Sequence, residues 1–308
     1  MNLKLHLTNR GLQTSILQKS NGQEVQLAPN SRNFVGVGAY FWRIGVKLYL
    51  PLPVSWFFDR AREYDSRVID IQSGLYLDKW LFDASLQWYS QLYPLSENEA
   101  SIPSPAENGL YSLQASLTTT YLFSGDRVSF KSPYNRNEMQ LESAGSWMLS
   151  GGFSYYKLDG EQSILGTASQ DNFGDVSLIS RVTAMSFHFR PGYVYNYVFG
   201  KFYLHTAASV GVALQDKSFI KSDITGDRLG VAPEYNLRAA LGYDDGRYFA
   251  SLFFVFQSTS LQFEELRINN SSRNVQFFVG YRLPTPAWLQ KLRPALLDKI
   301  LPMKSEKH

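Results

Sequence analysis

The sequence predicts an all-β protein, a transmembrane antiparallel up-and-down β-barrel of about 14 strands, with 12 as the alternative. Alternating polarity, paired aromatic residues and the spacing of the connections carry this prediction. Eight residues of strand span roughly 26 Å, or about 20 Å after a tilt of ~40°, which suits the apolar band of a membrane barrel. In five alternating stretches an aromatic residue stands at each end of one face: Trp80 and Trp88, Tyr111 and Tyr121, Trp147 and Tyr155, Tyr235 and Tyr243, Tyr248 and Phe256.

The clearest strand covers residues 79–92, where Phe82 and Leu86 face one way and Asp83 and Gln87 the other. Because side chains alternate along a strand, the polar sets of all strands must share one interior. The same pattern predicts strands at residues 2–8, 12–19, 23–28, 33–40, 42–52, 66–76, 79–92, 109–122, 145–157, 181–191, 199–213, 233–243, 246–257 and 273–283.

The expected connections alternate between tight and long, as membrane barrels require. Tight turns are predicted near residues 41, 77–78, 195–199 and 244–246, and long loops at 53–65, 92–108, 158–180, 214–232 and 258–272. Placing the tight turns in the periplasm puts both ends of the barrel chain there. Residues 123–144 break the rule, and we expect them either to extend the flanking strands or to form a periplasmic flap.

The chain divides into a barrel, residues 1–283, and an amphipathic helical periplasmic tail, residues 284–308. Thr285 and Pro286 suit the start of a helix. The tail is expected to lie beneath the barrel or in the membrane interface, or to dock a partner protein. Its apolar face would comprise Trp288, Leu289, Leu292 and Leu296.

Composition excludes several classes of protein. No run of about 18 apolar residues predicts a membrane-spanning helix. The 308 residues contain no cysteine, and a net charge of +3 without a Lys/Arg run gives no sign of nucleic-acid binding. The first residues lack the basic head and apolar core of a signal peptide. We therefore expect either a mature chain with an added Met or a sequence that begins downstream of the true start of the protein. A cytoplasmic protein is the alternative.

The histidines give no catalytic set. His205 and Ser209 share the polar face but stand about 13 Å apart along a strand, too far for a nucleophile and its base. His188 has Arg190 on its own face and no suitably placed serine. We expect ordinary polar residues of the lumen here, and no catalytic residue.

The predicted lumen is rich in charge, mostly positive. Asp70 and Asp83 fall on adjacent strands. As paired carboxylates they would perform acid–base chemistry or bind a cation, but we favour a structural role in which they form ion pairs across a filled lumen. The inward-facing cations expected by the same parity are Arg43, Lys47, Arg190, Lys201, Arg238, Arg247 and Arg282. An open pathway with this lining would prefer anions. The acidic segments 171–175 and 223–227 lack the spacing of a known calcium loop, so neither a metal nor a cofactor is predicted.

The segment from Phe130 to Gln140, followed by 143–151, resembles the signature of an uncharacterised Bacteroidota outer-membrane barrel family, the domain of unknown function 4421. The resemblance extends to Pro29-Asn30, to Asp70-x-Gln72 and to Pro191-Gly-Tyr193, and covers nearly the whole chain. It implies a barrel in the bacterial outer membrane and brings no established activity or catalytic residues.

Three functional hypotheses follow. The first is a non-enzymatic barrel, in contact with outer-membrane lipid, that serves as an accessory or scaffold subunit of a secretion, barrel-insertion or uptake machine and so has protein partners. The second is a passive, weakly anion-preferring diffusion channel. The third is a lipid-modifying enzyme of the outer membrane, which needs a Ser–His pair that the pattern does not supply.

Overall fold

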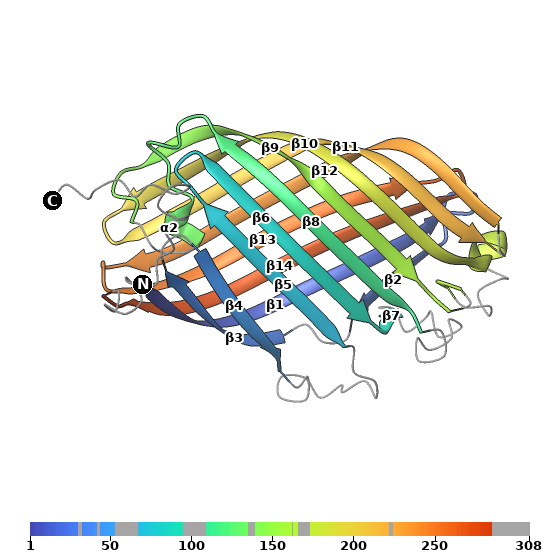
Figure 1. The fold of residues 1–308 in the computed structure, drawn as a ribbon, viewed down its shortest axis with the longest axis horizontal. Coiled ribbons are helices and arrows are strands. Elements are labelled where there is room, and N and C mark those ends of the chain that lie inside the picture. Colours follow the sequence, from blue (N-terminus) through green and yellow to red (C-terminus); the bar gives the residue numbers. More distant parts are fainter. Residues whose placement is uncertain are drawn as a thin grey trace, which may run out of the picture.

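The computed structural model describes residues 1–29, 33–41, 44–52, 67–94, 109–134, 139–161, 163–165, 173–221 and 224–284, and these form an antiparallel β-barrel (Figure 1). Within these residues no helix has the length and apolar character needed to cross a membrane. The elements are β1 (Asn2–Gln18), β2 (Glu24–Pro29), β3 (Asn33–Phe41), β4 (Ile44–Pro51), β5 (Val68–Tyr76), β6 (Trp80–Ser90), β7 (Leu92–Pro94), β8 (Tyr111–Leu122), α2 (Lys131–Tyr134), β9 (Ala144–Asp159), η4 (Gly174–Leu178), β10 (Ile179–Phe199), β11 (Phe202–Lys221), β12 (Ile224–Asp244), β13 (Tyr248–Gln262) and β14 (Leu266–Arg282).

Twelve of the fourteen described strands form a ring, in the order β1, β3, β4, β5, β6, β8 and then β9 to β14. The ring closes where β14 pairs with β1 from Asn2↔Arg282 to Gln18↔Leu266. The short strands β2 and β7 are not members of this ring, but they pair beside β1 at one end of the barrel. The predicted fold class is therefore confirmed, and the lower of the two expected strand numbers describes the ring.

The first two predicted strands, 2–8 and 12–19, are a single strand, β1, so the predicted break between them is wrong. Gly11 lies within the ladder, opposite Arg273. A Cβ added at Gly11 would stand 2.8 Å from the Arg273 side chain, so this glycine permits a close approach and makes no turn. The uninterrupted partner β14 keeps β1 extended through this position.

The strands of one wall run well past the predicted aromatic boundaries. Residues expected as the loops 214–232 and 258–272 continue the ladders, which reach Lys221↔Ile224 between β11 and β12 and Gln262↔Arg267 between β13 and β14. Those two loop predictions are wrong. Aromatic residues mark where a strand leaves the lipid, whereas hydrogen bonding to a neighbour decides where the strand ends.

The barrel has two different ends (Figure 1). The end that carries Met1 and the short connections 77–79, 200–201 and 245–247 is called the turn end here, and the opposite one the extension end. Gly200 and Gly246, in two of these connections, have φ values of 62° and 91°, which a residue with a Cβ rarely adopts. At the extension end β2 pairs with both β1 and β7, so the β2–β7 pair bridges the wall beyond β3, β4 and β5.

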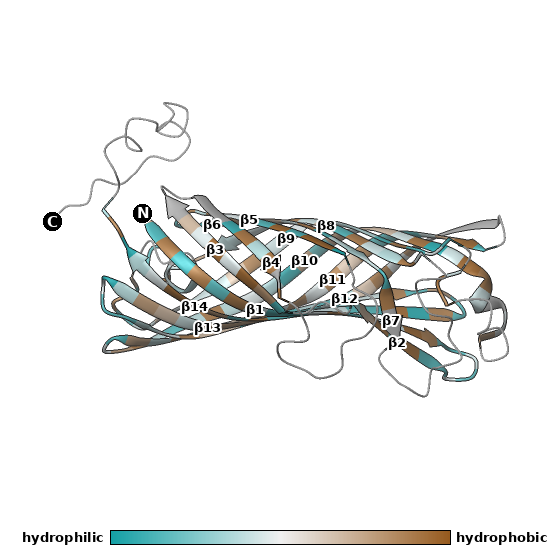
Figure 2. Cartoon of the chain, turned by 90° about the horizontal axis from the view of Figure 1, so that it is seen from below, coloured by the Kyte–Doolittle hydropathy of each residue, from teal (hydrophilic) through white to brown (hydrophobic). Residues whose placement is uncertain are grey.

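The outer surface carries an apolar band, while polar side chains alternate into the interior. Leu5, Ile71 and Phe187 are 55%, 58% and 63% exposed, whereas His6 and His188 beside them are buried. Figure 2 shows hydrophobic and hydrophilic residues alternating along the strands in the same way. An exposed apolar band on a barrel requires lipid around it, because water would not tolerate so continuous an apolar patch.

Candidate functional site

Residues 123–134 and 139–143, named the plug segment here, lie at the turn end, and the part from Val128 to Tyr134 folds into the lumen, whereas Leu141 is 72% exposed. Val128 and Phe130 are 1% and 3% exposed. Phe130 stacks on Tyr134 at 5.5 Å between ring centroids, and Tyr134 meets Phe253 edge-on at 4.9 Å. Residues 123–144 were expected to extend the flanking strands or to form a periplasmic flap, and that expectation is wrong. The segment folds inward from Val128 to Tyr134 because its aromatic side chains pack inside the barrel.

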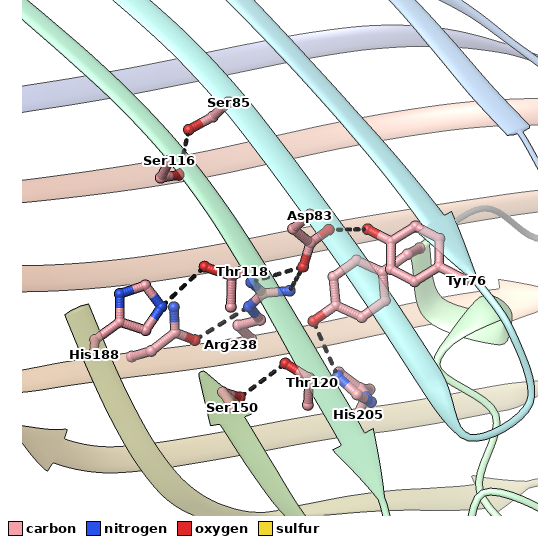
Figure 3. A network of polar contacts seen from close by, with 12 residues as sticks. Tyr76, Asp83, Ser85, Ser116, Thr118, Thr120, Ser150, His188, His205 and Arg238 are labelled. Carbon is pink, nitrogen blue, oxygen red and sulfur yellow. Dashed lines mark hydrogen bonds and ion pairs between the residues drawn. The ribbon is translucent and has the colours of Figure 1, made fainter. Parts of the chain in front are cut away.

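Polar contacts hold the plug segment to the barrel wall. The ammonium group of Lys4 donates a hydrogen bond of 2.7 Å to the Tyr134 carbonyl oxygen. His205 Nδ1 donates to Asn196 Oδ1 at 2.6 Å. This leaves Nε2 to accept from the Tyr134 hydroxyl at 3.3 Å, which Figure 3 draws as a dashed line from His205 to an unlabelled tyrosine. The Asn196 amide in turn donates to the Ser129 carbonyl oxygen at 3.0 Å. His205 is thus a structural residue that orients the plug segment.

Arg238 and Asp83 form an ion pair across the lumen next to the plug segment (Figure 3). The two groups are 3.4 Å apart, and the Tyr76 hydroxyl donates to the other Asp83 oxygen at 2.9 Å. The Arg238 guanidinium also lies 5.7 Å from the centre of the Tyr134 ring. Two strands far apart in the ring, β6 and β12, are thereby connected through the interior.

His188 has neighbours that suggest a nucleophile, a base and an acid. Its Nε2 lies 3.2 Å from Thr118 Oγ1, and its Nδ1 lies 3.9 Å from Glu234. Glu234, however, is held by Arg190 at 2.5 Å, and 3.9 Å is too long for a hydrogen bond that would orient the imidazole. Thr118 lies within the ladders of β8 with β6 and β9, which use the backbone N–H groups that an oxyanion site needs. The geometry supports a charge network better than catalysis.

Two adjoining cavities occupy the middle of the lumen, with volumes of 110 and 150 Å³. Both are lined by hydroxyl and amide side chains, and they share Ser85, Gln87, Ser116, Thr118 and Gln257. Ser85 and Ser116 are hydrogen bonded to each other at 2.7 Å. The cavities are suited to water or to a small polar group.

The extension end of the lumen is filled by apolar side chains. Ile16, Leu158, Val182 and Ile268, from four strands, are all fully buried there. They pack with Phe173, which precedes η4, and with residues of β2 and β13. This part of the barrel has a core like that of a water-soluble protein, which the sequence pattern did not predict.

The structure brings together several of the predicted lumen charges and places others elsewhere. Asp70 pairs with Arg10, and both side chains are almost fully buried. Asp83, Arg238, Arg190 and Lys47 all line the cavities. At the rim of the turn end, Arg282 pairs with Asp244 at 2.6 Å.

Two predicted lumen residues lie outside it. Lys201 and Arg247 are exposed in the short turns, where Arg247 donates to the Tyr281 hydroxyl, so their inward assignment is wrong. Both residues lie one position before a strand begins, at Phe202 and at Tyr248, so the alternation of side chains used for the prediction does not hold there. Arg43 and the tail residues Trp288, Leu289, Leu292 and Leu296 lie outside the described residues.

The acidic partners Glu234 and Asp244 and the cation Arg10 were missed by the sequence reasoning. Glu234 lies within the predicted strand 233–243 and shares the parity of Asn236 and Arg238, so following the alternation two residues toward the start of that strand would have found it. Arg10 lies in the break expected between the predicted strands 2–8 and 12–19, so no parity was assigned to it. In the part of the chain that the structure describes, no group of His, Asp or Glu could hold a metal ion.

Aromatic side chains surround the turn end of the barrel on its outer face. Trp80 packs on Tyr121 at 4.8 Å, Trp147 on Tyr193 at 5.2 Å, and Tyr248 on Tyr281 at 5.0 Å. Of the predicted opposite girdle, Tyr235 is 47% exposed, while Trp88, Tyr111, Tyr155 and Phe256 are partly covered. Tyr243, near the turn end, packs on Phe202 at 5.4 Å.

Solved structures similar to this chain share little sequence with it. The outer membrane protease OmpT of Escherichia coli is 11% identical with a TM-score of 0.44, over 92% of this chain and 96% of that one. The toluene transporter TodX of P. putida is 12% identical with a TM-score of 0.29, over 92% of this chain and 90% of that one. The attachment invasion locus protein Ail of Yersinia pestis is 8% identical with a TM-score of 0.28, over 90% of this chain and 99% of that one. No curated protein matches the sequence. The family model described as domain of unknown function (DUF4421) matches residues 1–283, and the chain therefore belongs to that family.

Proposed function

We propose that this chain is a non-enzymatic barrel of the bacterial outer membrane that acts as an accessory or scaffold subunit of a larger membrane assembly. Its short turns and plug segment face the periplasm in this proposal, and its long hairpins face outward. Lipid surrounds the apolar band, and partner proteins bind the parts of the barrel beyond it.

The filled lumen is the observation that supports this role. The plug segment occupies the turn end, ion pairs such as Arg238–Asp83 cross the middle, and an apolar core occupies the extension end. A pore needs a continuous wetted path, whereas a scaffold gains rigidity from a packed interior. The geometry around His188 also supports a non-enzymatic role, because its Nδ1 lies 3.9 Å from Glu234.

The test is to extract the tagged protein from its native membrane in mild detergent and to identify what co-purifies. Partners in fixed ratio to the chain are the expected result. A monodisperse chain without partners in several detergents would contradict the scaffold role. A barrel of unrelated sequence, tagged and extracted in parallel, controls for adventitious capture.

The passive channel stays as a second candidate because of the two adjoining polar cavities. The described cations Lys47 and Arg238 line the larger cavity, and an open path along them would favour anions. Stable, anion-selective conductance of the purified protein in planar bilayers would favour this function. We expect none, because both ends of the lumen are packed.

A further inference from the structure

The ladder between β4 and β5 stops after two residue pairs, Ile44↔Leu75 and Gly45↔Gly74. The neighbouring ladders, β3–β4 and β5–β6, continue through 8 and 9 pairs. Residues 46–51 and 68–73 are all in strands, yet they do not pair with each other. This unpaired stretch of the wall is named the β4–β5 gap here.

The β4–β5 gap is enclosed within the wall and lies at the depth of the membrane. The two pairs at Ile44 and Gly45 close it toward the turn end, and the β2–β7 pair bridges the wall toward the extension end. Its strand β5 pairs with β6 from Tyr76↔Leu81 to Ile69↔Trp88, within the stretch bounded by Trp80 and Trp88. The gap therefore faces lipid and is closed toward both ends of the barrel.

The two faces of the gap differ in polarity. On the outer face, Leu48 and Leu50 of β4 are 68% and 70% exposed, and Ile71 of β5 is 58% exposed. On the inner face, Lys47 and Gln72 line the 150 Å³ cavity, with Ser73 and Gly74 beside Gln72. Unpaired backbone in a membrane is tolerated only where it lines a wet cavity or is buried in protein. The cavity behind the gap meets the first condition.

The cavity itself selects a type of ligand. Among the described residues, the cations Lys47 and Arg238 and the carboxylate Asp83 line this cavity. A volume of 150 Å³ is that of about five water molecules in the liquid, which suits a phosphate group. Because described side chains fill both ends of the lumen, the membrane-facing gap is the direct way into this cavity.

We propose that the β4–β5 gap admits the anionic head group of a membrane phospholipid into the polar cavity, while the acyl chains stay outside over Leu48, Leu50 and Ile71. Lys47 on the inner face attracts the phosphate, and Gln72 and Ser73 offer hydrogen bonds. A peptide strand would satisfy the backbone edges, but it does not explain an apolar outer face joined to a cationic, hydroxyl-rich cavity. This site goes beyond the scaffold role, since it exists whether or not a partner protein is bound.

The absence of cysteine allows a direct test of the gap. In the pair Leu48→Cys and Ile71→Cys, the thiols flank the gap and should stay reduced under mild oxidant, because unpaired strands hold them too far apart. Two control pairs each keep one of these cysteines and place the second on a strand that pairs with it. They are Val37→Cys with Leu48→Cys, and Ile71→Cys with Leu86→Cys. These should form disulfides. Equal oxidation of all three pairs would show a closed ladder and overturn the proposal.

The ligand is tested with photoreactive lipids. The whole protein is placed in vesicles that contain phosphatidylglycerol or phosphatidylcholine with the same photoreactive group on the head group, and the labelled residues are mapped by mass spectrometry. Phosphatidylglycerol should label the inner face near Lys47 and Gln72. Lys47→Gln should lower this labelling about fivefold, the effect of one basic side chain on an anionic lipid, and Lys201→Gln, in an exposed turn, should leave it unchanged. Labelling confined to the outer face, equal labelling by both lipids, or a co-purified polypeptide cross-linked at the gap would each overturn the proposal.

Discussion

The two ends of the lumen are filled by different means. At the extension end, the strands that form the wall also supply the apolar core, as with Ile16 of β1 and Leu158 of β9. At the turn end, one segment between β8 and β9 folds inward and is held by stacked rings and by Lys4 and His205. The first filling belongs to the strands of the wall itself, whereas we expect the second to be able to detach while the wall stays intact.

The largest expected effect is on the extension end. Leu158→Ala should lower the free energy of unfolding by about 2–5 kcal/mol, because the side chain is fully buried among apolar neighbours. Urea unfolding in lipid vesicles, followed by tryptophan fluorescence, measures this loss. Leu229→Ala is the control, since Leu229 is 86% exposed and its truncation should change stability by less than about 0.5 kcal/mol. Equal losses for the two variants would contradict a packed core at this end.

Tyr134→Ala should have a smaller effect on the turn end, about 0.5–3 kcal/mol, although it removes contacts with several rings. The loss is limited because the plug segment can leave the lumen without unfolding the barrel. Limited proteolysis should then cut the plug segment faster, while planar bilayers should still show no conductance, because the extension end remains filled.

Tyr134→Phe is the matched control. It keeps the ring and loses only the hydroxyl, with its bonds to His205 and Arg238, so its proteolysis should stay close to that of the unchanged protein. Global unfolding of Tyr134→Ala would show that the plug segment belongs to the core of the fold.

The barrel was predictable because lipid imposes a simple pattern on the strands that cross it. Each lipid-facing stretch must alternate and end in aromatic residues, as between Trp80 and Trp88 of β6. The extension end lies beyond that constraint, so the ladders of β11 and β12 continued where loops had been expected. Sequence parity also found the inward position of Asp83 and Arg238.

The partners inside the lumen were harder to predict, because parity gives the face of a residue and not its depth along the barrel. Asp83 lies on β6 and Arg238 on β12, and only the tilt and register of the strands between them bring the two groups to 3.4 Å. The plug segment escaped prediction for a different reason. Its residues have no period, and its place in the lumen depends on contacts such as Lys4 with Tyr134, which are 130 residues apart.

Lys4→Met sharpens the comparison at the turn end. Methionine keeps the apolar stem but removes the hydrogen bond to the Tyr134 carbonyl, at a cost of about 0.5–1.5 kcal/mol. Hydrogen exchange should become faster in the plug segment and stay unchanged in the strands around Leu158. Lys201→Met, in an exposed turn, is the control and should alter neither region. Faster exchange at both ends would show that the two fillings are coupled.

The smallest effect concerns the turns of the turn end. Asp245 accepts hydrogen bonds from the backbone N–H groups of Tyr248 at 2.7 Å and Arg247 at 3.0 Å, and these bonds lower the pKa of its carboxyl below 3.8. A lowered pKa means that the folded state prefers the carboxylate, so this stabilisation is fully present above the usual pKa and is lost as the pH falls through the lowered one.

The unfolding midpoint of Asp245→Ala should therefore lie below that of the unchanged protein at neutral pH, and the difference should shrink only below about pH 4. Asp245→Asn keeps an acceptor oxygen without the charge, so its deficit should be smaller than that of Asp245→Ala. A difference between Asp245→Ala and the unchanged protein that persists at pH 2 would show that turn geometry, and not the charge of Asp245, stabilises this end. The plug segment would then be the part of the turn end where side-chain chemistry decides stability.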